Sequence, residues 1–199
     1  NNGSEGSFEY VTNGNNTTRT TLIKNQLIKA YKGSVDSDII NKDKMEYRHI
    51  LDANYHVDIK NAIISLCRDI RKDCFFWCDT GFRNSPEDAL DWRKNSFNIY
   101  TTYAGIYTQD LTYYDAYTGK DIRVTVPYIL ASKIPTIASS YGLQYPIAGT
   151  KRGLIDGFKT LCWTPNESYK KRLYGKKINY IEQDTRRTKI GSQLTADDT

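Results

Sequence analysis

The sequence predicts an α/β domain over residues 21–199, in which a mainly parallel sheet is flanked by helices and carries an added antiparallel hairpin. Segments with helical periodicity alternate three times with short apolar runs, which is the order of strand and helix in a parallel sheet. Two alternating segments then surround a glycine-containing turn, the pattern of a hairpin. With 199 residues, 39% of them hydrophobic, the chain can bury one core.

The N-terminal elements are predicted from composition and spacing. Residues 1–20 are rich in Gly, Asn, Ser and Thr with few apolar anchors, so we expect a flexible linker or loop. A helix is expected over 21–33, ending at Gly33, and a short strand over 46–51. The clearest helix covers 57–73, where apolar residues recur at spacings of three and four: Ile59, Ala62, Ile63, Leu66 and Ile70.

A strand, a helix and a second strand are predicted next. The apolar run CFFWCDT at 74–80 has the length of a strand covered on both faces. The segment 85–95 is expected to be a helix, because Ser85 can cap it and Pro86 suits its first position. The aromatic segment 97–107 is the next strand candidate.

The hairpin is predicted over 111–126, with Pro127 ending its second strand. A further short helix is expected over 132–142, closed by Gly142.

The net charge of +5 is concentrated in one stretch of sequence. Residues 169–190 contain eight Lys or Arg and two acids, so the remainder of the chain sums to about −1. Basic residues interleaved with Tyr can bind nucleic acid, although such a patch more often faces solvent or an acidic neighbour. Nucleic acid is therefore not the partner that we expect first.

Membrane insertion and secretion are not predicted. No apolar run approaches the roughly 20 residues of a spanning helix, and the first ten residues lack the order of a signal peptide. Because the chain does not begin with Met, we expect it to begin inside a longer polypeptide.

No metal or cofactor is predicted. The four cysteines lack paired spacing and three lie in or beside apolar sequence, so reduced thiols are expected, most of them buried small hydrophobic residues. Two isolated histidines add no ligand set. These residues are Cys67, Cys74, Cys78, Cys162, His49 and His56.

The glycine-rich stretch YPIAGTKRGLIDG at 145–157 raises the possibility of a phosphate-binding loop. Such a loop requires a Lys after its last glycine, followed by Ser or Thr. Here Lys151 precedes Gly153 and no hydroxyl residue follows it. We therefore expect a structural turn.

The tetrapeptide CDTG, which contains Asp79, matches the active-site motif of aspartic proteases. That chemistry needs two carboxylates that share a proton, and the chain has one such motif among predicted helices. Asp79 is expected to cap the turn after its strand instead. Since no other catalytic signature occurs, an enzyme is not predicted, and one acting through Asp79 is the last alternative.

The chain contains 16 Tyr, many of them between Tyr100 and Tyr117. Tyrosine is enriched at protein interfaces, but the outer face of a strand also carries it. Both interpretations remain open.

From His49 onward, the order of segments resembles the core domain of contractile tail sheath proteins of phages and related injection machines. The resemblance lies in a helix before an apolar strand ending in Asp (AIISLCRDIRKDCFFWCD) and in the segment YYDAYTGKDIRVTVPYILAS. It also lies in the block IASSYGLQYPIAGTKRGLIDGFKTLCWTPNESYKKRLYGKKINYI, followed by TRRTKIGSQLT. The chain departs from the family pattern at Ile190, Gly191 and Gln193, and it stops at Thr199 where sheath proteins continue into a C-terminal arm.

This resemblance implies a mechanical role in the virion, after assembly in the host cytoplasm. Sheath subunits stack as six-fold rings around a tail tube, and on a baseplate signal they contract and drive the tube through the host envelope for genome ejection. The implied partners are further copies of the chain, the tube protein, and baseplate and neck proteins, and no nucleotide or cofactor is consumed. The core would be truncated at both ends relative to the full-length protein.

Two alternatives remain open: a neck, terminator or baseplate protein with a sheath-like fold, and a basic nucleic-acid-binding domain. Under the sheath interpretation, nine cationic side chains are candidate intersubunit contacts, and the last seven would be the nucleic-acid contacts under the other. They are Lys151, Arg152, Lys170, Lys171, Arg172, Lys176, Lys177, Arg186 and Arg187.

Overall fold

A parallel four-stranded sheet forms the centre of the molecule in the computed structural model, which describes residues 16–34, 37–142 and 145–197. The strand order is β1-β2-β3-β7, and every neighbouring pair is parallel. The strands are β1 (His49–Leu51), β2 (Phe75–Asp79), β3 (Ala104–Tyr107) and β7 (Ile178–Asn179). The predicted α/β class with a mainly parallel sheet is confirmed.

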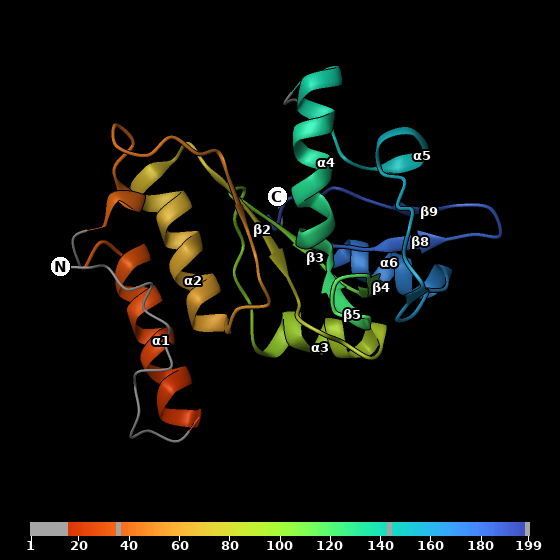
Figure 1. Cartoon of the computed structure of the whole chain (residues 1–199), viewed down its shortest axis with the longest axis horizontal. Coiled ribbons are helices and arrows are strands. Elements are labelled where there is room, and N and C mark those ends of the chain that lie inside the picture. Colours follow the sequence, from red (N-terminus) through yellow and green to blue (C-terminus); the bar gives the residue numbers. More distant parts are fainter. Residues whose placement is uncertain (1–15, 35–36, 143–144, 198–199) are drawn as a thin grey trace.

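Both faces of this sheet are covered, and alternate residues of β2 enter two separate cores. Phe76 and Cys78 join the core on one side, whereas Trp77 joins the core on the other. The first side carries α1 (Asn16–Tyr31) and α2 (Val57–Ser65), together with α3 (Pro86–Asn95) and α6 (Glu167–Gly175); the second carries α4 (Val126–Tyr141) (Figure 1). A sheet buried on both faces explains why β2 is apolar up to its last residue, Asp79.

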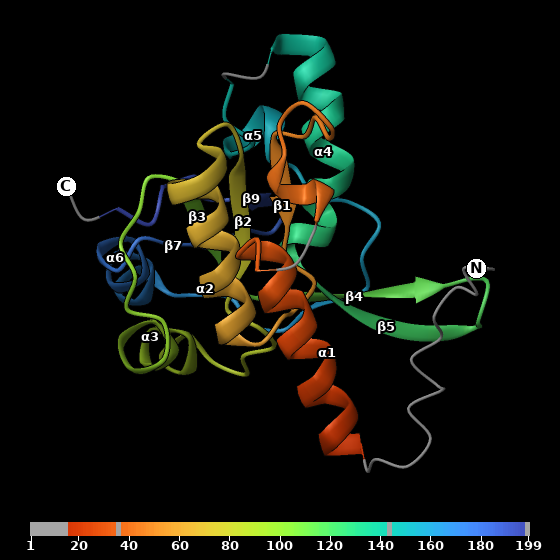
Figure 2. The same cartoon turned by 90° about the vertical axis from the view of Figure 1, so that its left-hand side faces the viewer.

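An antiparallel hairpin extends away from the body (Figure 2). It pairs β4 (Asp110–Asp115) with β5 (Lys120–Thr125), and the short β6 (Thr160–Leu161) pairs with the base of β4. The predicted hairpin is confirmed. A third, two-stranded sheet contains β8 (Ile181–Gln183) and β9 (Thr188–Ile190).

The predicted cap and start of the 85–95 helix are observed. The Ser85 hydroxyl accepts a hydrogen bond from the Asp88 amide at 3.1 Å, which caps α3, and Pro86 is its first residue. In the same way, the Asn166 side chain accepts from the Tyr169 amide at 2.9 Å and caps α6.

The predicted 57–73 helix changes character before its end. After Ser65 it continues as a π-helical segment, η3 (Leu66–Arg71), and stops at Lys72, which has a φ of 63°. The Lys72 amide donates to the Cys67 carbonyl at 3.0 Å, a wide-turn hydrogen bond that satisfies the helix end. A short 3₁₀ turn, η2 (Asp38–Ile40), lies beside it.

The start of the first helix and the start of the predicted strand 97–107 were predicted wrongly. The first helix begins at Asn16, so 16–20 are helical and not part of a linker, while 1–15 lie outside the described residues. Of the predicted strand 97–107, only Ala104–Tyr107 pairs with a neighbour. Phe97 instead turns back to stack on Trp92, with ring centroids 4.9 Å apart.

The helix predicted over 132–142 begins six residues earlier, at Val126. Pro127 lies in the first turn of this helix, where an N–H has no helical partner and its absence costs nothing. Because β5 has already ended at Thr125, Pro127 belongs to the helix and does not end the strand. Pro135 lies inside the helix. The hydroxyls of Ser132 and Thr136 bond to the carbonyls of Ile129 and Ser132 at 2.9 and 3.0 Å around it.

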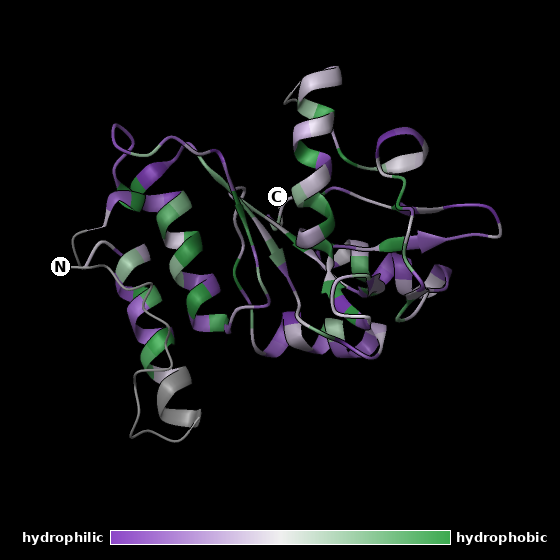
Figure 3. Cartoon of the chain, viewed as in Figure 1, coloured by the Kyte–Doolittle hydropathy of each residue, from purple (hydrophilic) through white to green (hydrophobic). Residues whose placement is uncertain are grey.

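Apolar and polar residues alternate along α1 and α2 (Figure 3). Within the described residues, none of the helices combines the length and the apolar character needed to span a bilayer.

Candidate functional site

Asp79 belongs to a buried ion cluster at the carboxyl edge of the parallel sheet. Lys60 reaches from α2 between two carboxylates, with its ammonium 2.5 Å from Asp52 and 2.8 Å from Asp79. The three side chains are at most 3% exposed. Asp52 directly follows β1 and Asp79 ends β2, so the parallel strands bring the two acids to the same edge.

Hydrogen bonds satisfy the remaining acceptor positions of Asp79. Its carboxylate accepts from the Gly81 amide at 2.8 Å, from the Thr125 hydroxyl at 2.8 Å and from the Asn54 amide at 3.2 Å. The bond to Gly81 confirms the predicted capping of the turn. Because Thr125 immediately precedes α4, the cluster also fastens the base of the hairpin to the central sheet.

The electrostatics of the cluster match a structural role. Burial alone would lower the pKa of Lys60, but the negative groups around it, including Asp79 and Asp52, raise it, so the ammonium stays charged. Burial and the Asp79 charge raise the pKa of Asp52, while Lys60 opposes that rise. Each carboxylate bonds to the ammonium between them, unlike the protease arrangement in which two carboxylates share a proton.

Sequence reasoning identified Asp79 but missed Asp52 and Lys60. A signal was present, because Lys60 precedes Ile63 and Ile64 by three and four residues and so lies on the apolar face of α2. A lysine at such a position needs a buried acid as partner.

The glycine-rich stretch folds as a tight turn around the one-turn α5 (Gly149–Arg152). A Cβ on Gly153 would lie 2.8 Å from backbone atoms of Ala148, so only glycine fits there. The Arg152 guanidinium bonds to the Pro146 carbonyl at 2.8 Å and lies 5.2 Å from the Tyr145 ring centre. The loop is thereby closed on itself.

After α5 the chain joins the third sheet. The Gly153 carbonyl accepts from the Ile190 amide at 2.8 Å, and the Ile155 amide donates to the Thr188 carbonyl at 2.8 Å. The side-chain oxygen of Gln193, one of the departures from the sheath pattern, accepts from the Ile147 amide. The predicted structural turn therefore follows α4 in the chain and is hydrogen bonded to β9.

The nine candidate contact residues lie on three separate segments of the chain. They lie on α5, on α6 and the loop after it, and in the β8–β9 turn at the far end of the molecule from α1 (Figure 1). Although these residues are close in sequence, β7 and β8 lie between α6 and the turn that contains Arg186 and Arg187. Their role in assembly stays a prediction.

Three of the nine already have partners within the chain. Arg172 makes a two-pronged ion pair with Glu87 of α3, with both contacts at 2.7 Å, and Lys170 pairs with Glu167 at 2.7 Å and Glu182 at 3.3 Å. Arg152 closes its own loop. Within the described part of the chain, six others make no ion pair: Lys151, Lys171, Lys176, Lys177, Arg186 and Arg187.

The tyrosines between 100 and 117 divide into a buried and an exposed set. Tyr107 is 1% exposed, and burial raises its pKa. Tyr117, at the hairpin tip, is 98% exposed, and Tyr114 is 59% exposed. Tyr107 therefore packs in the core at the end of β3, whereas Tyr114 and Tyr117 are exposed to solvent in the outer part of the hairpin.

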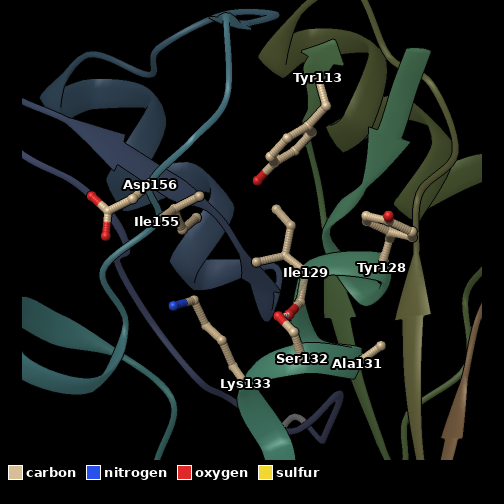
Figure 4. A pocket seen from close by; sticks show the side chains of 8 residues that line it. All are labelled: Tyr113, Tyr128, Ile129, Ala131, Ser132, Lys133, Ile155 and Asp156. Carbon is tan, nitrogen blue, oxygen red and sulfur yellow. Dashed lines mark hydrogen bonds between the residues drawn. The ribbon is translucent and has the colours of Figure 1, made fainter. Parts of the chain in front are cut away.

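A groove of about 640 Å³ lies between α4 and the segment after α5 (Figure 4). Tyr113 and Ile129 face it from the hairpin and the helix, and Lys133 and Asp156 stand on its opposite walls. Burial raises the pKa of Tyr113, which stays protonated at neutral pH.

The cysteines fit the prediction of buried thiols at three of four positions. Cys67, Cys74 and Cys78 are buried, whereas Cys162 is exposed. Over residues 16–34, 37–142 and 145–197, no group of three or more His, Cys, Asp or Glu side chains could hold a metal ion.

No protein-family model matches the chain, and no curated protein matches its sequence. Solved structures do match. The baseplate of the anti-feeding prophage (AFP), determined by cryo-EM with six-fold symmetrisation, aligns with a TM-score of 0.58 and 13% identity over 79% of this chain and 40% of the other. The AFP helical sheath in its contracted state aligns with a TM-score of 0.56 and 15% identity over 78% of this chain and 41% of the other.

The chain spans about two fifths of each of these neighbours. The similarity shows that the chain has a sheath-like fold, the fold shared by these parts of a contractile assembly. The fold implied by the sequence resemblance is therefore confirmed.

Proposed function

We propose that this chain is the core of a structural subunit of a contractile tail sheath, which polymerises around a tail tube and contracts to drive it through a host envelope. The observation that carries the proposal is the match to the contracted AFP sheath over 78% of the chain. The sequence blocks that resemble sheath proteins span the elements from β1 to β9.

The architecture suits repeated assembly. The body is fastened internally by the Lys60 cluster, while the β4–β5 hairpin and the β8–β9 turn extend from it in different directions (Figures 1 and 2). Contacts made by two different surfaces of the same subunit propagate as rings or helical stacks. Contraction would repack such contacts as rigid-body motion, without a nucleotide.

The partners under this proposal are further copies of the chain, a tube protein, and baseplate and neck proteins of the same virion. The six cations without intrachain ion pairs are the candidate contacts, and Arg186 and Arg187 at the exposed β8–β9 turn are the first to test.

A second candidate is a baseplate or neck component of the same fold, favoured by the match to the AFP baseplate. Such a protein would form rings of fixed size, whereas a sheath subunit would also form tubes of variable length. A nucleic-acid-binding domain is the third candidate, since the six cations are available to phosphates; its binding would weaken steeply with salt.

Sedimentation velocity of the full-length protein tests the proposal. The parent protein is expected to form large particles, and Arg186→Glu with Arg187→Glu is expected to shift them toward monomer. The matched control reverses the same number of charges at the opposite end, with Lys29→Glu in the last turn of α1 and Lys32→Glu just after it, both at exposed side chains. Equal effects of both double variants would show a net-charge effect and count against a contact at the β8–β9 turn.

A further inference from the structure

Two buried thiols lie in direct contact on the α2 side of the sheet. The Cys67 and Cys74 sulfurs are 3.4 Å apart, and the residues are 0% and 4% exposed. Cys67 lies in η3, and Cys74 immediately precedes β2. The chain between them makes the turn at Lys72 and returns to the sheet.

The turn that brings these thiols together is rigidly anchored. The Arg71 guanidinium makes a two-pronged pair with Asp73 at 2.9 Å and donates to the carbonyls of Ile39 at 3.1 Å and Met45 at 2.8 Å. It also lies 4.0 Å from the centre of the Tyr47 ring. Arg71 itself is fully buried, so the loop cannot shift without breaking these contacts.

The geometry leaves only a short movement between the two thiols and a bond. A disulfide needs sulfurs about 2.05 Å apart, so these two sulfurs, now 3.4 Å apart, must approach by rotation about their Cα–Cβ bonds. The other cysteines are differently placed. The Cys78 thiol bonds to the Asp79 carbonyl, and the Cys162 sulfur accepts from the Asp110 amide.

We propose that Cys67 and Cys74 form an oxidation-sensitive dithiol that closes into an intramolecular disulfide when the protein meets a peroxide. The Cys74 thiolate attacks one oxygen of hydrogen peroxide and becomes a sulfenic acid as the O–O bond breaks and water leaves. The Cys67 sulfur then attacks the Cys74 sulfur, and the hydroxyl departs as a second water. Two thiols and one peroxide thus give one disulfide and two waters.

The order of these steps follows from the hydrogen bond between the thiols. The Cys67 hydrogen bond lowers the pKa of Cys74, and the same interaction raises the pKa of Cys67. When Cys74 is deprotonated, the Cys67 thiol donates the hydrogen between the two sulfurs, and we assign Cys74 as the first thiolate. It also lies beside the exposed Asp73 and Lys72, the side from which a small oxidant can approach.

The disulfide would join η3, which continues α2, to the residue just before β2, the strand that contains Trp77 and Asp79. It would fix one face of the sheet covalently and restrict the unfolded chain. The effect does not depend on the proposed sheath role, because it concerns the single subunit.

The test uses the full chain with Cys162→Ser, which removes the exposed thiol that could cross-link subunits. After hydrogen peroxide, the intact mass is expected to fall by about 2 Da, the two hydrogens lost on closure, with a Cys67–Cys74 peptide found by mapping. The change is expected to reverse with dithiothreitol, and the melting temperature of the oxidised protein to rise.

Two further variants keep the result interpretable. Cys78→Ser in the same background is expected to close normally, and Cys74→Ser is expected to abolish the mass loss. If Cys74→Ser does not fold, peptide mapping of the Cys162→Ser protein alone decides. Unchanged thiols at Cys67 and Cys74 after peroxide, or a gain of oxygen mass at either sulfur without a cross-link, would overturn the proposal.

Discussion

The Lys60 ammonium lies 2.8 Å from a carboxylate oxygen of Asp79, and both side chains are buried where β2 ends. With Asp52 and Thr125, this contact joins α2, two strands of the central sheet and the start of α4. The cluster is therefore the point at which the hairpin and α4 are held against the sheet.

Removing the cation should destabilise the fold strongly. Lys60→Met leaves two buried carboxylates without their partner, and breaking a buried pair in this way costs about 3–5 kcal/mol. Urea unfolding followed by Trp fluorescence measures the loss. Arg68→Met, which removes the exposed pair with Asp69, is the control and should leave the midpoint nearly unchanged. Equal midpoints for the two variants would contradict the structural role of Lys60.

Stability should decline at alkaline pH through half-buried tyrosines. Burial raises the pKa of Tyr47 from 10.0 to about 12. Because the folded state holds the phenol proton more tightly, this contribution is complete below pH 10 and is lost as pH rises from 10 toward 12. Tyr31 contributes in the same window, since burial raises its pKa to about 12 as well.

Denaturation with urea at several pH values checks this. Tyr47→Phe should show a shallower decline between pH 10 and 12 than the parent protein, although it loses the 2.6 Å hydrogen bond to the Ile39 carbonyl. Tyr117→Phe, at a side chain 98% exposed, should decline as the parent does. Identical slopes in all three proteins would contradict the prediction.

Gly153 should not tolerate a side chain. A Cβ there would lie 2.8 Å from the Ala148 backbone, so Gly153→Ala must open the turn around α5 at a cost of about 1–3 kcal/mol. Gly175 has open space around the corresponding position, and Gly175→Ala in the last turn of α6 should be neutral or stabilising by up to about 1 kcal/mol. Calorimetric melting of both variants decides, and a harmless Gly153→Ala would refute the close packing.

The hairpin tip should matter for assembly and not for folding. Tyr117→Ser removes an exposed ring, so the melting temperature should not change, but particle formation should need about tenfold more protein if the tip is a contact. Tyr117→Phe keeps the ring and should assemble normally. Assembly by Tyr117→Ser at the parent concentration would exclude the tip as a major contact.

The elements that could be predicted are those with strong local signals. The 85–95 helix has a capping serine, a proline and early acids in order, and the structure places its start at that cap. The hairpin was predictable because its turn and its alternation agree. Fold class followed from these, since alternation of helices and strands leaves few arrangements.

What could not be predicted depends on distant pairing. β7 has only two residues and is a strand because Ile178 and Asn179 pair with β3, far away in sequence. The early start of α4 was missed because Pro127 has two possible roles, and the packing of Leu130 against the sheet selects the helix. The Lys60 cluster escaped prediction because its members are joined by the fold and not by spacing.

Negative-stain electron microscopy of the purified protein is the most direct test of the proposed sheath role. We expect rings or helical tubes in which the sheath-like core repeats, with the β4–β5 hairpin and the β8–β9 turn at contacts between subunits. Uniform monomers at high protein concentration, both alone and with tube and baseplate proteins from the same virion, would contradict it.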